Sequence, residues 1–131
     1  MRTYKCKVDD LGETVNKILT EYADDVAEGT KEAVKAVAKI AKQETQAGSP
    51  VGSGKYKRGW TVREENLSRI QTSAIVHNRS AYQLAHLLEK GHALVKGGRT
   101  IGQVKAIPHI EKAEQKAIKN LEEAIRQIAE R

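Results

Sequence analysis

The longest regular pattern in the chain is a stripe of apolar residues at helical spacing. Between residues 11 and 47 apolar side chains recur every three or four positions, at Leu11, Val15, Ile18, Leu19, Tyr22, Val26, Ala33, Val37 and Ile40. This spacing predicts one long amphipathic helix, and Asp10 followed by Glu13 has the spacing of a capping box at its start. Gly29 lies inside the helix and costs roughly 1 kcal/mol relative to Ala, so the pattern leaves open whether the helix breaks there.

An unbroken helix has a consequence for assembly. A helix of about 36 residues at 1.5 Å each spans about 54 Å, whereas a globular domain of this length has a radius of gyration of roughly 14 Å. Such a helix extends beyond its own domain, and the apolar stripe on the projecting part needs another chain to cover it. We therefore expect a homo-oligomer whose interface is formed by Val15, Ile18, Tyr22, Val26, Val37 and Ile40.

Helical spacing returns near the end of the chain. Pro108 fixes the start of a closing helix, whose apolar residues are Ile110, Ala113, Ala117, Leu121, Ala124, Ile125 and Ile128. A short helix is expected before it, capped by Ser80, with Tyr82 and Leu88 toward the core. Gly91 follows as the residue that ends this short helix.

Shorter segments with alternating polarity predict strands. At the start of the chain, residues 2–8 place Tyr4, Cys6 and Val8 on one face, as in a half-buried strand. Cys6 is the only cysteine, which excludes an internal disulfide and suits a reducing cytoplasm. An isolated cysteine on a strand is usually a small buried apolar residue, and we expect the same here.

Two further pairs of segments predict hairpins. Residues 60–63 and 70–77 alternate on either side of a polar turn at residues 64–68. A second pair flanks Gly97-Gly98, which favours a flexible hairpin. This hairpin is a basic arm with the candidate docking residues Lys96, Gly97, Gly98, Arg99 and Lys105.

The order of these elements predicts an α+β fold in a single domain spanning residues 1–131. The long N-terminal helix and the C-terminal helix are expected to pack on a small antiparallel sheet, with the short helix and the basic hairpin arm beside them. No apolar run approaches the roughly 20 residues that a transmembrane helix needs, so no membrane partner is expected.

The positive charge is concentrated in the middle of the chain. The whole sequence has a net charge of +6, and residues 48–108 carry ten Lys or Arg against three Glu. A basic patch of this kind favours contact with nucleic acid or with an acidic protein surface. The charge alone does not choose between these partners.

No combination of residues predicts an enzyme. The glycine-rich segment at residues 48–55 departs from a phosphate-binding loop, because Ser49 and Tyr56 occupy the positions that need Gly and Ser or Thr. His86, Glu89 and His92 do not have the spacing of a zinc-binding helix, and no thiolate accompanies them. We therefore expect no catalytic residues, no metal and no cofactor.

Two blocks of residues resemble the neck-protein family of long-tailed bacteriophages. The first contains Ser49-Pro50-Val51, Gly54-Lys55-Tyr56 and Gly59-Trp60, and the second contains Tyr82, Leu88-Glu89-Lys90-Gly91-His92, Gly97-Gly98 and Pro108-His109-Ile110. The resemblance covers roughly residues 48–131, with the long helix before it in the expected place. Its structural motif residues in this chain are Trp60, Tyr82, Glu89, Gly91, His92 and Pro108.

The resemblance implies a structural role in the virion. Members of this family are tail components, head–tail joining proteins or tail-completion proteins, and they contribute no catalytic residues. The implied function is a ring of identical subunits between the capsid connector and the tail, through which DNA passes without being read. The basic middle of the chain leaves one alternative, a small DNA-binding protein without sequence specificity.

Overall fold

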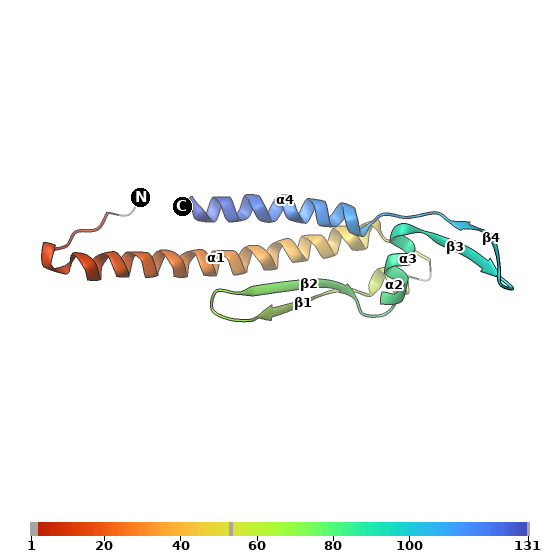
Figure 1. The fold of residues 1–131 in the computed structure, drawn as a ribbon, viewed down its shortest axis with the longest axis horizontal. Coiled ribbons are helices and arrows are strands. Elements are labelled where there is room, and N and C mark those ends of the chain that lie inside the picture. The colour runs from red at the N-terminus through yellow and green to blue at the C-terminus, as the bar shows by residue number, and fades with distance from the viewer. Residues whose placement is uncertain (1–2, 53, 131) are drawn as a thin grey trace.

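The structure is a computed structural model that describes residues 3–52 and 54–130. Its elements, in chain order, are η1 (Val8–Asp10), α1 (Leu11–Gly48), α2 (Lys55–Arg58), β1 (Trp60–Asn66), β2 (Thr72–Asn78), η2 (Tyr82–Leu84), α3 (Ala85–Lys90), β3 (His92–Lys96), β4 (Arg99–Val104) and α4 (Ile110–Ala129). The predicted α+β class is confirmed, and the molecule is elongated along α1 (Figure 1). Within the described ranges, no helix is long and apolar enough to cross a membrane.

The helix α1 runs without interruption from Leu11 to Gly48, passing through Gly29. At 1.5 Å per residue, its 38 residues span roughly 57 Å. Gly29 gives space to the neighbouring helix, because a Cβ at this position would lie only 3.1 Å from the Ile128 side chain. Close packing therefore accounts for a residue of low helix propensity inside a continuous helix.

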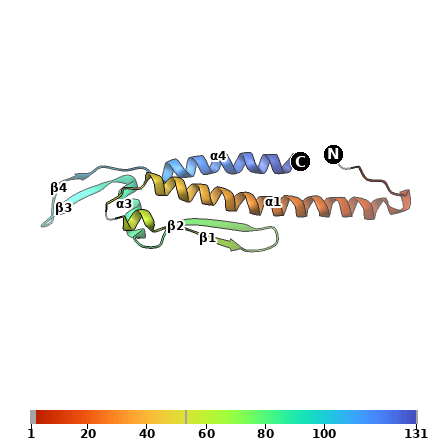
Figure 2. The same ribbon diagram turned by 180° about the vertical axis from the view of Figure 1, so that it is seen from behind.

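The helix α4 lies antiparallel to α1 and covers only part of it (Figures 1 and 2). Next to the start of α4, His109 packs against Gly48 at the end of α1. At the other end of α4, the Tyr22 hydroxyl donates a 3.0 Å hydrogen bond to the carbonyl of Ala129. The covered part of α1 therefore extends from about Tyr22 to Gly48, and residues 11–21 lie beyond the end of α4.

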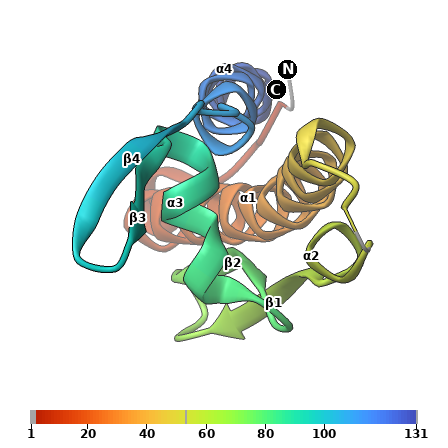
Figure 3. The same cartoon turned by 90° about the vertical axis from the view of Figure 1, so that its right-hand side faces the viewer.

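The strands β1 and β2 form an antiparallel hairpin on a different side of α1 from α4 (Figure 3). Lys35 of α1 lies 3.9 Å from Glu64 of β1, and Arg69 in the hairpin turn pairs with Asp24 of α1. Ion pairs thus link the hairpin to α1 at two positions along the helix. Its register runs from Trp60 opposite Asn78 to Asn66 opposite Thr72.

The turn of this hairpin occupies residues 67–71, three residues later than residues 64–68 where it was expected. The polar residues at the end of β1 keep their backbone paired while Glu64 remains exposed. Ser68 stabilises the turn, since its hydroxyl oxygen accepts the backbone N–H groups of Ile70 and Gln71 at 3.3 and 3.1 Å. Local hydrogen bonds of this kind decide where the turn lies. The prediction relied on the polarity of residues 64–68 alone and therefore placed the turn too early.

The strands β3 and β4 form a second, separate two-stranded sheet, which is the predicted hairpin around Gly97-Gly98. Both glycines have positive φ, +60° and +75°, as the two central residues of a type I′ turn require. The hairpin projects from the body at the end opposite to the start of α1 (Figure 1). The structure also refines the predicted arrangement, because α4 packs on α1 and only the β1–β2 sheet lies against a long helix.

The predicted N-terminal strand is wrong. Residues 3–7 form no strand, Val8 begins the short helix η1, and Arg2 lies outside the described residues. Cys6, which was expected to be buried, is exposed. An alternating segment forms a strand only where it pairs with another strand, and the four strands of the described structure pair only with one another, β1 with β2 and β3 with β4. The predicted capping box is also wrong, because Asp10 occupies the N-cap position without a side-chain cap hydrogen bond.

The short predicted helix is present, but its start differs from the prediction. Its first turn is the 3₁₀ segment η2, and Tyr82 is 66% exposed instead of facing the core. A 3₁₀ turn has three residues per turn, which rotates the first side chains away from the stripe that α-helical spacing predicts. Ser80 provides no cap, and the chain is turned instead by Asn78, whose side-chain oxygen accepts the N–H groups of Ser80 and Ala81 at 3.1 and 2.9 Å.

The contact between Gly29 and Ile128 can be tested by filling it. We expect Gly29→Leu to lower the free energy of unfolding by about 1–3 kcal/mol, because the added side chain must push α1 and α4 apart. Gly12→Leu is the matched control, since nothing lies within 4 Å of a Cβ at that position. Urea denaturation followed by circular dichroism measures both. Equal stability of the two variants would contradict the close packing described here.

Candidate functional site

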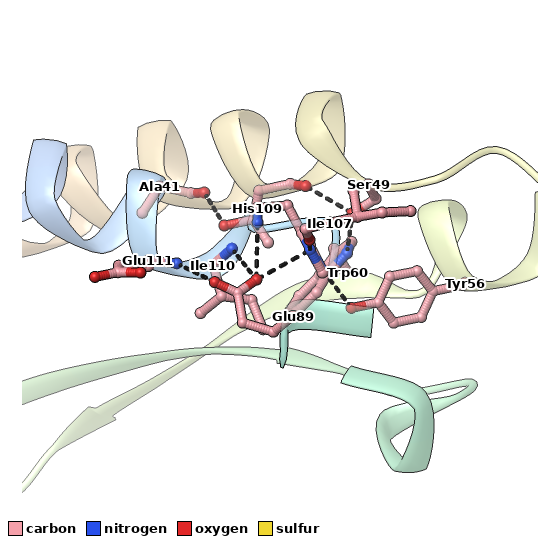
Figure 4. Close-up of polar contacts among 10 residues, drawn as sticks. Ala41, Ser49, Tyr56, Trp60, Glu89, Ile107, His109, Ile110 and Glu111 are labelled. Carbon is pink, nitrogen blue, oxygen red and sulfur yellow. Dashed lines mark hydrogen bonds and ion pairs between the residues drawn. The ribbon is translucent and has the colours of Figure 1, made fainter. Parts of the chain in front are cut away.

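A cluster of buried polar and aromatic side chains lies where α1, α2, β1, α3 and the start of α4 come together (Figure 4). Four of its members, Ser49, Tyr56, Trp60 and His109, are almost fully buried. The rings of Tyr56, Trp60 and His109 pack edge to face, with centroids 5.6 to 6.1 Å apart. Aromatic pairs favour this geometry beyond the area that they bury. The cluster therefore contains a large part of the buried core of this elongated molecule.

Glu89 of α3 caps the N-terminus of α4 from outside that helix. Its carboxylate accepts the backbone N–H groups of His109, Ile110 and Glu111 at 2.7, 2.9 and 2.8 Å. The first N–H groups of a helix have no partner within the helix, and α4 has His109, which makes no side-chain cap hydrogen bond, at its N-cap position. A carboxylate from another element thus supplies what the local sequence lacks.

The surroundings of Glu89 favour its charged form. Burial by itself would raise the pKa of the carboxyl, but the three backbone N–H groups and His109 together outweigh it and hold the pKa of Glu89 below its ordinary value. A negative charge at this position also interacts favourably with the dipole of α4. The carboxylate is therefore held as an anion by the helix that it caps.

His109 connects Glu89 to Tyr56. Its Nδ1 lies 2.7 Å from the carbonyl oxygen of Ile107 and 3.1 Å from a carboxylate oxygen of Glu89. Both neighbours only accept hydrogen bonds, so Nδ1 carries a proton, and in the neutral ring Nε2 accepts the Tyr56 hydroxyl at 2.6 Å. Burial, followed by the charge of Glu89, raises the pKa of Tyr56 to about 12, which keeps this hydroxyl a donor.

A second chain of hydrogen bonds attaches β1 to the end of α1. The Ser49 hydroxyl donates to the carbonyl of Thr45 at 2.6 Å and accepts the indole N–H of Trp60 at 2.8 Å. The Gln46 side chain donates to the carbonyl of Lys57 at 3.0 Å and so joins α1 to α2. Trp60 itself is buried in the core.

The connection from α3 into β3 depends on Gly91. This residue has φ +74°, and a Cβ there would lie 2.6 Å from the carbonyl oxygen of Val104 and 3.0 Å from the backbone nitrogen of Ala106. Only glycine adopts this conformation readily and allows so close an approach. The predicted end of the short helix at Gly91 is therefore confirmed. His92 follows it as the first residue of β3 and is half-buried.

The polar groups of the cluster serve to hold the surrounding elements together. Every polar atom of Glu89, His109 and Tyr56 named above bonds to another group of the chain, and the His109 side chain is completely buried. Glu89 bonds to the backbone at the start of α4 and to His109. In the part of the chain that the structure describes, no three metal-binding side chains gather into a site.

Sequence patterns singled out most of these residues, but they did not reveal which of them are hydrogen-bonded to one another. Glu89 and His109 are 20 positions apart, and although both belong to the second block of the resemblance, their spacing does not show that they bond to each other. One signal was present, since a helix that begins at Pro108-His109 has no Ser, Thr, Asp or Asn at its N-cap and therefore needs a cap from elsewhere. Asn78, whose side chain donates to the carbonyl of Tyr56 at 2.6 Å, was missed entirely.

The residues predicted for the oligomer interface divide into two groups. Val26 and Val37 are half-buried on the part of α1 along which α4 of the same chain lies. Val15 and Tyr22 expose 45% and 49% of their surface near the free end of α1, where Ile18 is half-buried. Ile40 is 40% exposed although it belongs to the covered part.

The apolar stripe of α1 continues beyond the end of α4. We call residues 8–22 the overhang. Large apolar side chains remain exposed along it, at Val8, Leu11, Val15, Leu19 and Tyr22. Tyr4 partly accompanies this segment, with its hydroxyl 3.2 Å from Glu21, but does not cover it. The overhang therefore presents an apolar helical face with no partner among the described elements.

The predicted docking residues lie together at the other end of the molecule. We call residues 90–105 the basic arm. It carries Lys90, Lys96, Arg99 and Lys105, and no acidic residue. All of β4 except Val104 is exposed, and the arm also exposes the apolar side chains of Leu94, Val95 and Ile101.

Comparison with known protein families assigns the chain to a family. Residues 9–91 match the HK97-gp10-like family, described as "Bacteriophage HK97-gp10, putative tail-component". The chain belongs to this family. The match includes α1, the β1–β2 hairpin and Glu89, and it stops at Gly91, so it leaves out β3, β4 and α4. No curated protein and no solved structure matches the chain.

Membership of the HK97-gp10-like family gives the chain a structural, tail-related role in a bacteriophage. The resemblance drawn from the sequence began at about residue 48, whereas the family match begins at residue 9 and so includes the long helix. Together, the projecting helix and the arm suit a protein whose surfaces are completed by other subunits of a phage particle.

Removal of the Glu89 carboxylate tests its role as a cap. We expect Glu89→Ala to lower the free energy of unfolding by about 1–3 kcal/mol, because three backbone N–H groups, two of them in partly buried bonds, lose their acceptor. Glu114→Ala on the exposed face of α4 is the control and should change stability by less than about 0.5 kcal/mol. Urea denaturation monitored by circular dichroism distinguishes the two. A Glu89→Ala variant as stable as the control would show that the cap is dispensable.

The lowered pKa of Glu89 also predicts a dependence of stability on pH. A carboxyl whose pKa is lower in the folded state binds its proton more readily when unfolded, so its contribution is complete above the unfolded pKa of 4.5 and falls as pH drops through the folded pKa. The stability difference between the wild type and Glu89→Gln should therefore be largest above pH 4.5 and shrink below it. Urea titrations of both proteins at a series of pH values measure this. A difference that stays constant with pH would contradict the ionised cap.

Proposed function

We propose that this tail component is a subunit of the head–tail junction, where identical copies form a ring between the capsid connector and the tail. The observation that carries this proposal is the overhang, whose apolar stripe extends past the end of α4 and stays exposed. Monomeric proteins rarely leave a continuous apolar face of this kind uncovered. A second chain is the natural cover in an assembly of identical subunits.

The basic arm supports a docking role. A two-stranded hairpin has marginal stability by itself in water, and this one projects from the body with exposed apolar and basic side chains. Such a hairpin gains stability when it contacts a neighbouring protein of the junction. The two ends of the molecule thus offer separate contacts, one helical and one formed by a hairpin.

The charge of the arm supports the proximity of DNA. Its four basic residues have no acidic neighbour within residues 90–105, and phosphate groups interact with such a surface without base recognition. The same charge favours the alternative, a small DNA-binding protein without sequence specificity. That alternative predicts salt-sensitive binding to any DNA duplex, with a Kd of roughly 1–100 μM at physiological salt, whereas a subunit of a ring binds DNA only weakly as an isolated chain.

Shortening the arm tests the assembly role. Leu94 lies opposite Gly102, so replacing Val95–Ile101 with Asn-Gly joins two register partners through a two-residue turn and leaves the buried cluster untouched. We expect this variant to fold normally but to leave phage heads and tails unjoined, because the docking surface is lost. Electron microscopy of lysates and titres of infectious phage measure the effect.

A conservative change at the same site provides the control. Thr100→Ser keeps the hairpin and its charge and should yield normal particles. Infectious particles at wild-type titre from the shortened arm would contradict the docking role. If the main defect of the shortened arm is instead a loss of tight binding to duplex DNA, the result favours the DNA-binding alternative.

A further inference from the structure

We propose that the basic arm of one copy docks on the overhang of a second copy. This inference rests on the proposed function, because it names the neighbour that the arm contacts within the junction. Its two surfaces are the overhang, residues 8–22, and the basic arm, residues 90–105. They lie at opposite ends of the elongated molecule (Figures 1 and 2).

The two ends carry opposite charge. The overhang, residues 8–22, holds one Lys against four Asp or Glu, a net charge of −3. It stays negative, at −1, when Lys5 and Lys7 of the adjoining residues 3–7 are included. The arm holds four basic residues and no acidic one, a net charge of +4. Opposite charge of this kind steers two surfaces together and disfavours contact between like ends.

Both ends also combine their charge with exposed apolar side chains. On the overhang, Leu11 and Leu19 are 54% and 61% exposed, and on the arm, Val95 and Ile101 are each 59% exposed. A contact between the two ends would remove apolar surface from water on both partners, which is the main favourable term in protein association. Charge selects the pairing, and the apolar side chains supply most of its stability.

The overhang has a shape that suits an added element. It continues the side of α1 on which α4 lies, beyond the bond between Tyr22 and Ala129 where α4 ends. Residues 3–7 run back along this side (Figure 1), with Tyr4 bonded to Glu21, and they leave Leu11 and Leu19 exposed for a hairpin to contact. The short hairpin and the short exposed part of α1 form a small contact, so each pair associates weakly and a closed ring gains strength from many such contacts.

The contact joins different chains. Within one molecule, α1 spans roughly 57 Å between the two ends, and the arm is attached beyond the far end of that helix. The arm therefore cannot reach the overhang of its own chain. A contact between unlike surfaces of identical chains is heterologous, and repeated contacts of this type generate rings or filaments.

Two variants that each remove one surface test the proposal. Leu11→Lys with Leu19→Lys changes the overhang, and Lys96→Glu with Arg99→Glu changes the arm; all four side chains are exposed, so folding should be unaffected. We expect the wild type to self-associate reversibly at low salt and each variant alone to associate about tenfold more weakly or not at all. A mixture of the two variants should form a one-to-one complex, because one intact arm meets one intact overhang. Sedimentation velocity at concentrations up to about 1 mM measures these species.

Matched substitutions on α4 serve as controls. Ile118→Lys with Ile125→Lys repeats the apolar-to-basic change on exposed side chains, and Lys112→Glu with Lys119→Glu repeats the charge reversal on exposed side chains. Both controls should self-associate like the wild type. High salt should weaken association of the wild type and of both controls, since the attraction between the ends is screened.

Three outcomes would overturn the inference. The first is a wild type that stays monomeric at every concentration and salt level. The second is an arm variant that associates as strongly as the wild type, which would mean that the overhang pairs with itself. The third is a mixture of the two variants that stays monomeric.

These outcomes are separate from failure of the proposed function. If shortening the arm blocks the joining of heads and tails while the wild type never self-associates, the junction role stands and the arm contacts another tail protein. If the variants behave as expected but the shortened arm yields normal particles, the self-association stands and the junction role fails.

Discussion

The placement of α4 depends on one carboxylate. Glu89 of α3 accepts three backbone N–H groups at the start of α4, and His109 beside it joins the same carboxylate to Tyr56. Because the N-terminus of a helix needs acceptors and α4 supplies none of its own, this carboxylate fixes where α4 begins. Once its start is fixed against Gly48, its 20 residues determine how far it extends along α1.

The uncovered surfaces follow from that placement. A helix of 20 residues cannot cover a helix of 38, so the apolar stripe near the start of α1 remains exposed. At the other end, Gly91 redirects the chain from the capping element α3 into β3, and the basic arm leaves the body there. The buried cluster around Glu89 therefore positions both ends that the proposed assembly uses, and α1 connects them.

Much of the fold could be predicted because its signals are local. The stripe of α1, the closing helix after Pro108, both hairpins and the Gly97-Gly98 turn were all correct to within a few residues, since each depends on spacing or on backbone conformation. The errors have physical causes as well. The alternating segment at residues 2–8 has no partner strand, Tyr82 lies in a 3₁₀ turn, and Ser68 shifts the hairpin turn by its own hydrogen bonds.

The sequence by itself determined the class of the fold, the amphipathic character of both long helices, and the location of the positive charge. Only the tertiary structure decided that Gly29 leaves α1 unbroken, that Glu89 caps α4, and that the overhang stays uncovered. Each of these depends on contacts between residues far apart in the chain, such as Gly29 with Ile128 and Glu89 with His109. Spacing reveals which face of an element is apolar, but the element that covers this face is chosen by long-range packing.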